Sequence, residues 1–246
     1  MKKLVLHIPH SSTEIPLLDG YVSSHNEIQQ EIIKLTDWYT DDLFDSQVDY
    51  KIVAPFSRIF CDVERFADDE LEMMSKVGMG VLYEKLDSDE LLRKVSPELR
   101  EKIITNYYWK HHNSLTTIVE EQLKRNGECL IVDCHSFPST PLQKAINQNS
   151  NTPDFNIGID SFHTPKKYIE ASITYFENLG YSLGVDWPYS GSIVPMKYYQ
   201  KEKRVNSIML EINRKLYLNE PTNEKSKDYN KTKEVVQGYL NMLRTF

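Results

Sequence analysis

The sequence lacks most of the features that mark secreted, membrane-spanning or redox proteins. It has three cysteines in 246 residues. This odd number, without CxxC spacing, is typical of a reducing compartment and of cysteines that pack in a core. No apolar stretch has the length needed to span a bilayer. The amino terminus begins Met1-Lys2-Lys3 and continues into a short apolar segment, without a signal-peptide core or cleavage site. We therefore expect a cytoplasmic protein with no membrane partner.

Positive charge is also scarce. The 29 Lys and Arg residues are outnumbered by 36 Asp and Glu residues, which gives a net charge of -7 and a pI near 5.6. The basic residues are scattered, so no basic field would attract nucleic acid. The remaining partner class is a small molecule or a short peptide. The length suffices to bury the core of one α/β domain, and we expect a single domain over residues 1–246.

Strand-like and helix-like segments alternate along the chain. The expected strands are 4–10, 51–54, 59–63, 78–83, 129–134, 155–159, 181–185 and 207–212. The expected helices are 25–47 with a new helix opening at Thr36-Asp37, most of 89–126 with a start at Ser96-Pro97-Glu98, 165–179 and 223–245. Polar loops are expected at 11–24 and 136–155, and an exposed loop or short helix at 64–76. This alternation predicts an α/β fold: one central, mixed, mostly parallel sheet flanked by helices.

Two of the expected strands end on a histidine. The run Ile131-Val132-Asp133-Cys134-His135-Ser136 leads into His135, and Leu4-Val5-Leu6-His7-Ile8-Pro9-His10 ends on His10. Open α/β sheets bind their ligands at the carboxyl ends of the strands. A lone strand-end histidine is often only a hydrogen-bonded structural residue, but two that reach the same edge favour a metal site. The remaining candidates, His25, His111, His112 and His163, are interpreted as loop or packing residues.

The order and spacing of several short motifs resemble the N-formylglutamate amidohydrolase family over residues 4 to about 217. The motifs are Ile8-Pro9-His10-Ser11-Ser12, Thr36-Asp37-Trp38-Tyr39-Thr40-Asp41, Ser57-Arg58, Asp62-Val63-Glu64-Arg65, Asp133-Cys134-His135-Ser136, Pro188-Tyr189-Ser190-Gly191 and Glu211-Ile212-Asn213-Arg214. That family is in turn similar to the zinc carboxypeptidases. The resemblance implies a phosphorylase/hydrolase-like α/β fold and a catalytic zinc ion.

The resemblance also implies a ligand set. In the related enzymes a first-strand histidine, an acid that opens the next helix and a later Asp-x-His-Ser histidine hold one zinc ion. These positions correspond here to His10, Asp37 and His135. Glu14 is the alternative third ligand, because it follows His10 by four residues and could fold back. Asp133 shares a strand face with His135 and could support that ligand.

A glutamate on a late strand acts as the base in the related enzymes, and Glu211 matches it. Glu211 is the lone acid in the apolar strand Ile208-Met209-Leu210-Glu211-Ile212. A buried carboxylate is costly unless it is paired or functional. Its role is therefore either that of a general base or that of an ion-pair partner, for example of Arg214. Arg58 or Arg65 is the candidate for stabilising the oxyanion together with zinc.

Two arginines and the Pro-Tyr-Ser-Gly turn at 188–191 supply candidates for substrate binding. A guanidinium can hold a substrate carboxylate through two hydrogen bonds, and we expect this of Arg65, Arg214 or both. Tyr189, Ser190 and Gly191 could line the pocket. The chain departs from the family at Glu64, where Asn is frequent, and at Ser190-Gly191-Ser192, where a double glycine is common. If Glu64 faces the pocket, it disfavours a second carboxylate on the substrate.

These features lead to one main functional hypothesis and two alternatives. The main hypothesis is a Zn²⁺-dependent hydrolase that cleaves the amide bond of an N-acyl amino acid, with N-formyl-L-glutamate as one candidate. The first alternative is a zinc peptidase or amidase that acts on a peptide, including a cell-wall peptide. The second is a metal-binding protein whose site is degenerate and does not catalyse. The joint presence of the two histidines, Asp37 and Glu211 favours catalysis over degeneration.

Overall fold

The computed structural model describes residues 3–246 and confirms the mixed, mostly parallel sheet. Six strands lie in the order β2-β1-β3-β6-β4-β5. All neighbours are parallel except β4, which runs antiparallel to β6. The strands are β1 (Val5–Ile8), β2 (Tyr50–Val53), β3 (Cys129–Phe137), β4 (Phe155–Gly158), β5 (Leu183–Val185) and β6 (Val205–Asn213). Because β1, β3 and β6 are parallel, their carboxyl ends lie at one edge of the sheet.

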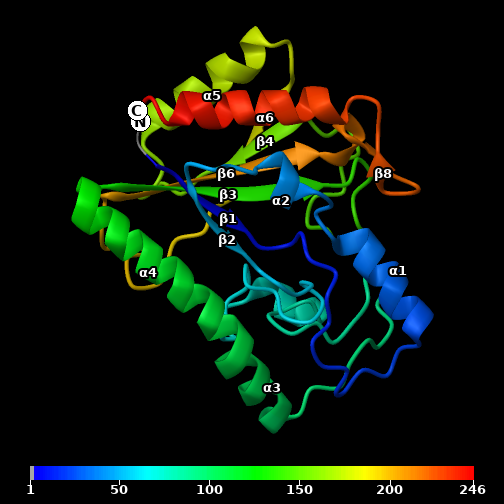
Figure 1. Ribbon diagram of the computed structural model, residues 1–246. Coiled ribbons are helices and arrows are strands. Elements are labelled where there is room, and N and C mark those ends of the chain that lie inside the picture. Colours follow the sequence, from blue (N-terminus) through cyan, green and yellow to red (C-terminus); the bar gives the residue numbers. More distant parts are fainter. Residues whose placement is uncertain (1–2) are drawn as a thin grey trace.

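Helices cover both faces of this sheet (Figure 1). Helices α5 (Lys166–Asn178) and α6 (Tyr229–Leu243) lie together on one face. On the other side lie α4 (Trp109–Asn126) and the long connections that carry α1 (His25–Leu35) and α3 (Pro97–Ile103). The short helix α2 (Thr40–Leu43) follows α1. Within residues 3–246, no helix combines the length and the apolar character needed to cross a membrane.

Alternation along β3 separates an apolar face from a functional face. Leu130, Val132 and Cys134 belong to the core cluster that contains residues of α5 and α6. Ile131 instead packs in the cluster that contains Val119 of α4. Successive strand residues point to opposite faces, so Asp133 and His135 share the α4 face with Ile131. All nine residues of β3 are buried, which explains its continuous apolar run.

The prediction of strands at 59–63 and 78–83 is wrong. Both segments are irregular, and the backbone N–H of Asp62 donates to the Val81 carbonyl at 2.8 Å. Their apolar residues are buried because these loops fold against α1 and α3 and form small cores of their own. A short apolar run reports burial, and it cannot by itself distinguish a strand from a packed loop. Cys61 is therefore buried in a loop, whereas Cys129 and Cys134 lie in β3.

The region around Thr36 also differs from expectation. Thr36 ends α1, since its N–H and Oγ1 both bond to the Ile32 carbonyl at 3.0 and 2.7 Å. The next helix begins only at Thr40, so Asp37 lies in the link between α1 and α2.

Other boundaries shift by a few residues. The start at Ser96-Pro97 is confirmed, and a π-helical segment, Ile104–Tyr108, joins α3 to α4. Short 3₁₀ turns occur at Met73–Val77 and Arg214–Leu216. A small hairpin of β7 (Leu218–Asn219) and β8 (Glu224–Lys225) precedes α6, which therefore begins later than expected.

Candidate active site

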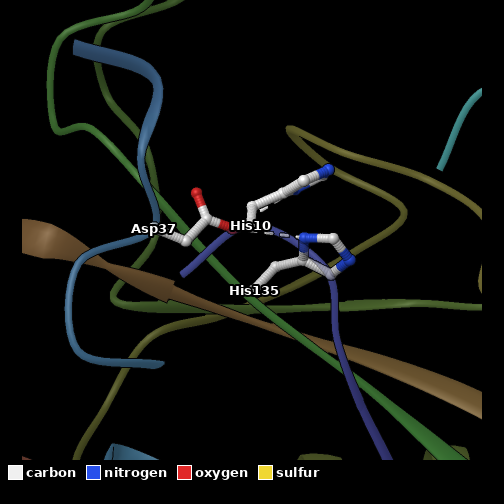
Figure 2. A group of neighbouring side chains, drawn as sticks. All are labelled: His10, Asp37 and His135. Atoms are coloured by element: carbon white, nitrogen blue, oxygen red, sulfur yellow. Dashed lines mark hydrogen bonds and ion pairs between the residues drawn. The ribbon is translucent and has the colours of Figure 1, made fainter. Parts of the chain in front are cut away.

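Three elements bring His10, Asp37 and His135 together at the carboxyl edge of the sheet (Figure 2). His10 lies two residues beyond the end of β1, and His135 lies near the end of β3. Asp37 comes from the link between α1 and α2, and its backbone N–H donates to the His10 carbonyl at 3.0 Å. All three side chains are buried. The backbone hydrogen bond fixes the acid beside the first histidine.

One ligand-type atom from each side chain faces the other two. Each of the three residues offers one possible metal-ligand atom, and these three atoms lie within 4.8 Å of one another. Asp37 Oδ2 is 3.6 Å from His10 Nδ1 and 3.2 Å from His135 Nδ1. In the described part of the chain, buried His10 Nδ1 has no hydrogen-bond partner.

The opposite atom of each side chain is held by a neighbour. His10 Nε2 lies 2.8 Å from Asp62 Oδ1, and His135 Nε2 lies 3.0 Å from Asp133 Oδ1. A carboxylate only accepts, so both Nε2 atoms donate, and in its neutral form each ring keeps a lone pair on Nδ1. Asp37 Oδ2 then requires a positive charge beside it, which is either a proton on His135 Nδ1, donated to Asp37 Oδ2 at 3.2 Å, or a metal ion. An imidazole–imidazole–carboxylate donor set with supporting carboxylates fits Zn²⁺.

The pKa shifts of Asp37 and His135 are those expected of a site that attracts a positive charge. Burial disfavours the ionised Asp37, but the positive imidazoles and Arg214 outweigh burial and lower its pKa. Burial alone would lower the pKa of His135, yet Asp133 and Asp37 raise it well above the usual value. The pocket therefore favours a cation, a proton or a metal ion, between these side chains.

Asp62 orients His10, a role that the sequence did not predict, although Asp62 is part of the Asp62-Val63-Glu64-Arg65 motif. It is fully buried and accepts hydrogen bonds at Oδ2 from Arg58 Nη2 at 2.9 Å and from the Tyr83 hydroxyl at 2.8 Å. Arg65 Nε lies 3.7 Å from the same oxygen. Burial opposes ionisation, but Arg58 and His10 hold the pKa of Asp62 well below its usual range. The signal in the sequence was an acid flanked by two arginines.

Glu211 lies directly beside the histidine of β3. The parallel register pairs His135 with Glu211, so both side chains point to the same face of the sheet. The Glu211 Oε2 atom is buried and has no hydrogen-bond partner among the described residues. Burial raises the pKa of this carboxyl to about 8. The ion pair with Arg214 weighed from the sequence is absent from residues 3–246, because Arg214 pairs with Asp37 instead.

Arg214 and Arg65 differ in how many of their nitrogens donate hydrogen bonds. Arg214 donates from Nη2 to Asp37 Oδ1 at 3.0 Å, from Nη1 to the Lys34 carbonyl at 2.8 Å and from Nε to the Ser136 hydroxyl at 3.3 Å. All three Arg214 nitrogens therefore already donate hydrogen bonds within the protein, one of them to Asp37. Arg65 Nε, by contrast, is buried without a hydrogen-bond partner in the described chain. Arg65 is therefore the arginine with donor capacity to spare.

A cavity of about 520 Å³ joins these groups. Its walls include the cluster His10, Asp37 and His135, the candidates Arg58, Glu64, Arg65, Tyr189, Ser190, Gly191, Glu211 and Arg214, and apolar side chains such as Met74, Met79, Leu142, Val194 and Met209. Glu64 thus faces the cavity. Glu14 is exposed and lies outside both the cavity lining and the cluster.

Of the histidines that the sequence assigned to loops or packing, His112 lines the cavity, whereas His25, His111 and His163 do not. His25 begins α1. The rings of His111 and His112 lie on α4, and His112 Nε2 is 3.0 Å from the Val63 carbonyl. His163 is buried, with its Nδ1 at 2.7 Å from the Val205 carbonyl. The residue that the sequence reasoning overlooked is His7, which is fully buried in β1.

Comparisons with known proteins place the chain in a family. The model of the N-formylglutamate amidohydrolase family matches residues 2–218. The crystal structure of N-formylglutamate amidohydrolase from Ralstonia eutropha JMP134 is similar with a TM-score of 0.84 and 23% identity, covering 98% of this chain and 92% of that one. Gene product Atu2144 from Agrobacterium tumefaciens has a TM-score of 0.67 and 15% identity, covering 98% and 91%. The comparison with curated proteins found no match. The family inferred from the motifs is thus confirmed: the chain belongs to the N-formylglutamate amidohydrolase family.

Proposed function

We propose that this protein is a zinc-dependent amidohydrolase that cleaves an N-acyl amino acid into a carboxylate and a free amino acid. Membership of an amidohydrolase family supports amide hydrolysis. The observation that carries the zinc-dependent form is the cluster of His10, Asp37 and His135, which lines a cavity together with Glu211. His10 Nδ1 is buried there without a hydrogen-bond partner among the described residues, 3.6 Å from Asp37 Oδ2.

His10, Asp37 and His135 would hold the metal, and Asp62, Asp133 and Arg214 would fix their orientation. A zinc ion there would supply Lewis acidity, for polarising a carbonyl and for making water acidic enough to lose a proton near neutral pH. Three protein ligands leave room for a further one, which is the pattern of a catalytic rather than a structural site. The cavity gives a substrate access to that side of the cluster.

Glu211 is proposed as the general base. It would take a proton from the attacking water and pass it to the leaving amine. A catalytic acid–base group works best when its pKa lies near the operating pH, and burial raises the pKa of Glu211 to about 8. Its unpartnered Oε2 is free to accept that proton. Its place beside His135 sets the base next to the ligands.

Arg58 is the candidate for stabilising the oxyanion that forms at the amide carbonyl. Its Nε and Nη2 bond to Asp62 at 3.2 and 2.9 Å, which holds the guanidinium rigidly in the cavity wall. A preorganised donor of this kind needs no reorientation as charge develops. Arg65 is assigned instead to the substrate carboxylate, because its Nε has no hydrogen-bond partner among the described residues.

The cavity wall suggests what the rest of the substrate is like. Glu64 carries a carboxylate into the cavity, which disfavours a second carboxylate on the substrate. Methionine and aliphatic side chains line much of the remaining wall. An N-acyl amino acid with one carboxylate and an apolar portion is therefore favoured over N-formyl-L-glutamate. A peptide substrate is the alternative, because a cavity of about 520 Å³ has the size that holds a drug-sized ligand.

The test is hydrolysis of a panel of formyl-, acetyl- and succinyl-amino acids and N-acyl dipeptides, measured as release of free amine. The purified protein is compared zinc-loaded, chelator-treated and zinc-restored. We expect activity that is lost with chelator and recovered with zinc. Glu14→Gln serves as a control acid outside the cluster. Equal hydrolysis with and without chelator would exclude the zinc-dependent mechanism, and faster cleavage of the dipeptides would favour the peptidase.

A further inference from the structure

A second group of potential ligands lies next to the first. His7 Nδ1, Glu64 Oε1 and Asp133 Oδ1 lie within 4.8 Å of one another. His7 on β1 and Asp133 on β3 occupy paired positions in the sheet, and both side chains are fully buried. Glu64 comes from the loop after β2, with 16% of its side chain exposed. None of the roles proposed above uses His7.

The hydrogen bonds of this group do not balance. His7 Nδ1 is 2.9 Å from Asp133 Oδ1 and 3.1 Å from Glu64 Oε1. The nitrogen has at most one hydrogen, and the hydrogen bond goes to Asp133. Glu64 Oε1 is thereby left buried without a hydrogen-bond partner within the described residues. Buried carboxylate oxygens without partners are unfavourable, so the group favours a positive charge beside Glu64 Oε1, either a second proton on His7 or a metal ion.

The far side of His7 has the arrangement expected of a metal ligand. His7 Nε2 lies 2.8 Å from His111 Nε2, so one of the two nitrogens donates and the other accepts. With His7 Nε2–H as the donor, Nδ1 keeps a lone pair directed at the two carboxylates. A histidine that binds a metal through one nitrogen almost always donates its other N–H to a neighbour. On the other side of the group, the Ile193 N–H donates to Asp133 Oδ2 at 3.0 Å and holds that carboxylate.

We propose that His7, Glu64 and Asp133 bind a divalent transition-metal ion, as a second cation site beside the His10, Asp37 and His135 cluster. One imidazole nitrogen and two carboxylate oxygens suit Zn²⁺ or Mn²⁺. The two carboxylates match the charge of the ion, and Glu64 Oε1 gains the partner it lacks. Asp133 links the sites, because its Oδ1 also accepts from His135 Nε2 at 3.0 Å. The proposal depends on the second group alone and not on the reaction.

The test counts metal ions. The metal-free protein is dialysed against buffered Zn²⁺, and in parallel against Mn²⁺, and bound metal per chain is measured by mass spectrometry. We expect two zinc ions in the parent protein, one in Glu64→Gln and two in Glu14→Gln, an exposed acid used as the matched control. Asp37→Asn should retain the second ion. In addition, His111→Phe should weaken only the second site, by about 10–100-fold, because it removes the partner of His7 Nε2.

Cobalt titration followed by visible absorption gives an independent readout. Two saturating phases are expected in the parent protein and one in Glu64→Gln, whose remaining phase also shows that the variant is folded. A single phase in the parent protein that Glu64→Gln leaves unchanged would overturn the second site, and His7 would then hold a proton there. That result leaves the proposed amidohydrolase intact, whereas loss of the single phase in Asp37→Asn alone would confirm the first cluster as its only location.

Discussion

Glu211 and His135 occupy paired positions on the parallel strands β6 and β3. This pairing sets a carboxyl whose Oε2 has no hydrogen-bond partner within residues 3–246 beside a buried imidazole at the edge of the sheet. Because side chains at paired positions share a face, the base candidate and the metal-ligand candidate need no loop to bring them together. Burial between the two strands also raises the pKa of Glu211 to about 8. The same sheet register therefore determines both the position and the basicity of the carboxyl.

Glu211→Gln should retain metal and fold but lose most turnover. The amide is nearly isosteric with the carboxyl, yet it cannot accept a proton from water. Loss of a general base costs roughly 10²–10⁴ in rate. Turnover of the best substrate from the panel, together with zinc content and thermal unfolding, checks this. Near-parental kcat in a zinc-loaded variant would show that Glu211 is structural.

Replacing a ligand of the first cluster should remove the zinc ion bound there, whereas replacing Glu14 should not. His135→Ala and Asp37→Ala each delete one of three ligand candidates, and both should lose the zinc ion of the first cluster after gel filtration in metal-free buffer. Glu14→Ala should keep it, because Glu14 is exposed outside the cavity. Metal analysis of the three variants at equal protein concentration decides the matter. If Glu14→Ala lost more zinc than Asp37→Ala, the choice of third ligand would be reversed.

The sequence predicted those features that depend on strand pattern. Buried parallel strands are visible in a sequence as apolar runs. The positions of His10 and His135 at strand ends, and of Glu211 as the lone acid of a strand, could therefore be recognised before the fold was known. Asp62 could not, because it acts from an irregular loop whose apolar neighbours imitate a strand. Its function depends on contacts with residues far along the chain, and no local pattern encodes these.

His7 illustrates a second limit of the sequence. It stands within an apolar strand, where a histidine is easily taken for a packed residue. Its partners Asp133 and His111 are more than 100 positions away in the sequence. Only the pairing of β1 with β3 and the placement of α4 bring them together. The long polar loop was expected to begin at 136, whereas β3 continues to Phe137 because β6 pairs with it along its whole length.

Asp62→Asn should weaken zinc binding without removing a ligand. Asp62 orients His10 through the 2.8 Å contact at Nε2, and an amide in its place no longer offers a charged acceptor. Changes in such supporting residues typically lower metal affinity by about 10–100-fold. Competition with a chelator of known affinity measures this, and Asp19→Asn, at an exposed acid, is the control. An unchanged zinc affinity in folded Asp62→Asn would mean that His10 is oriented by other contacts.

Acid should weaken the attachment of α2 to α6. Asp42 accepts hydrogen bonds from Lys233 Nζ and the Tyr229 hydroxyl, both at 2.6 Å, and these lower its pKa to about 2 from 3.8. A pKa that is lower in the folded state stabilises the fold above the unfolded value and is lost as the pH falls towards 2. Asp42→Asn should therefore cost up to about 1 kcal/mol at pH 7, since exposed pairs are screened.

The same comparison at pH 2 gives the sign. There Asp42 is about half protonated in the folded parent and almost fully protonated when unfolded, so the difference in free energy of unfolding between parent and Asp42→Asn should be much smaller than at pH 7. Asp41→Asn, on the neighbouring exposed position of α2, controls for a general change in charge. Denaturant unfolding at the two pH values measures both differences. A difference that grows on acidification would contradict the assignment.

Arg65→Met should change substrate preference more than overall activity. Arg65 Nε is buried without a hydrogen-bond partner in the described chain and the side chain lines the cavity, so a substrate carboxylate could accept from it. A charge-assisted hydrogen bond contributes about 1.5–3 kcal/mol, or roughly a tenfold to hundredfold change in affinity. KM for N-acyl amino acids should rise by that factor, while KM for the matching neutral amides should change little. Arg125→Met, an exposed arginine on α4, is the control. Equal effects of Arg65→Met on charged and neutral compounds would remove Arg65 as the carboxylate anchor and would favour a substrate bound mainly by its apolar portion or its peptide backbone.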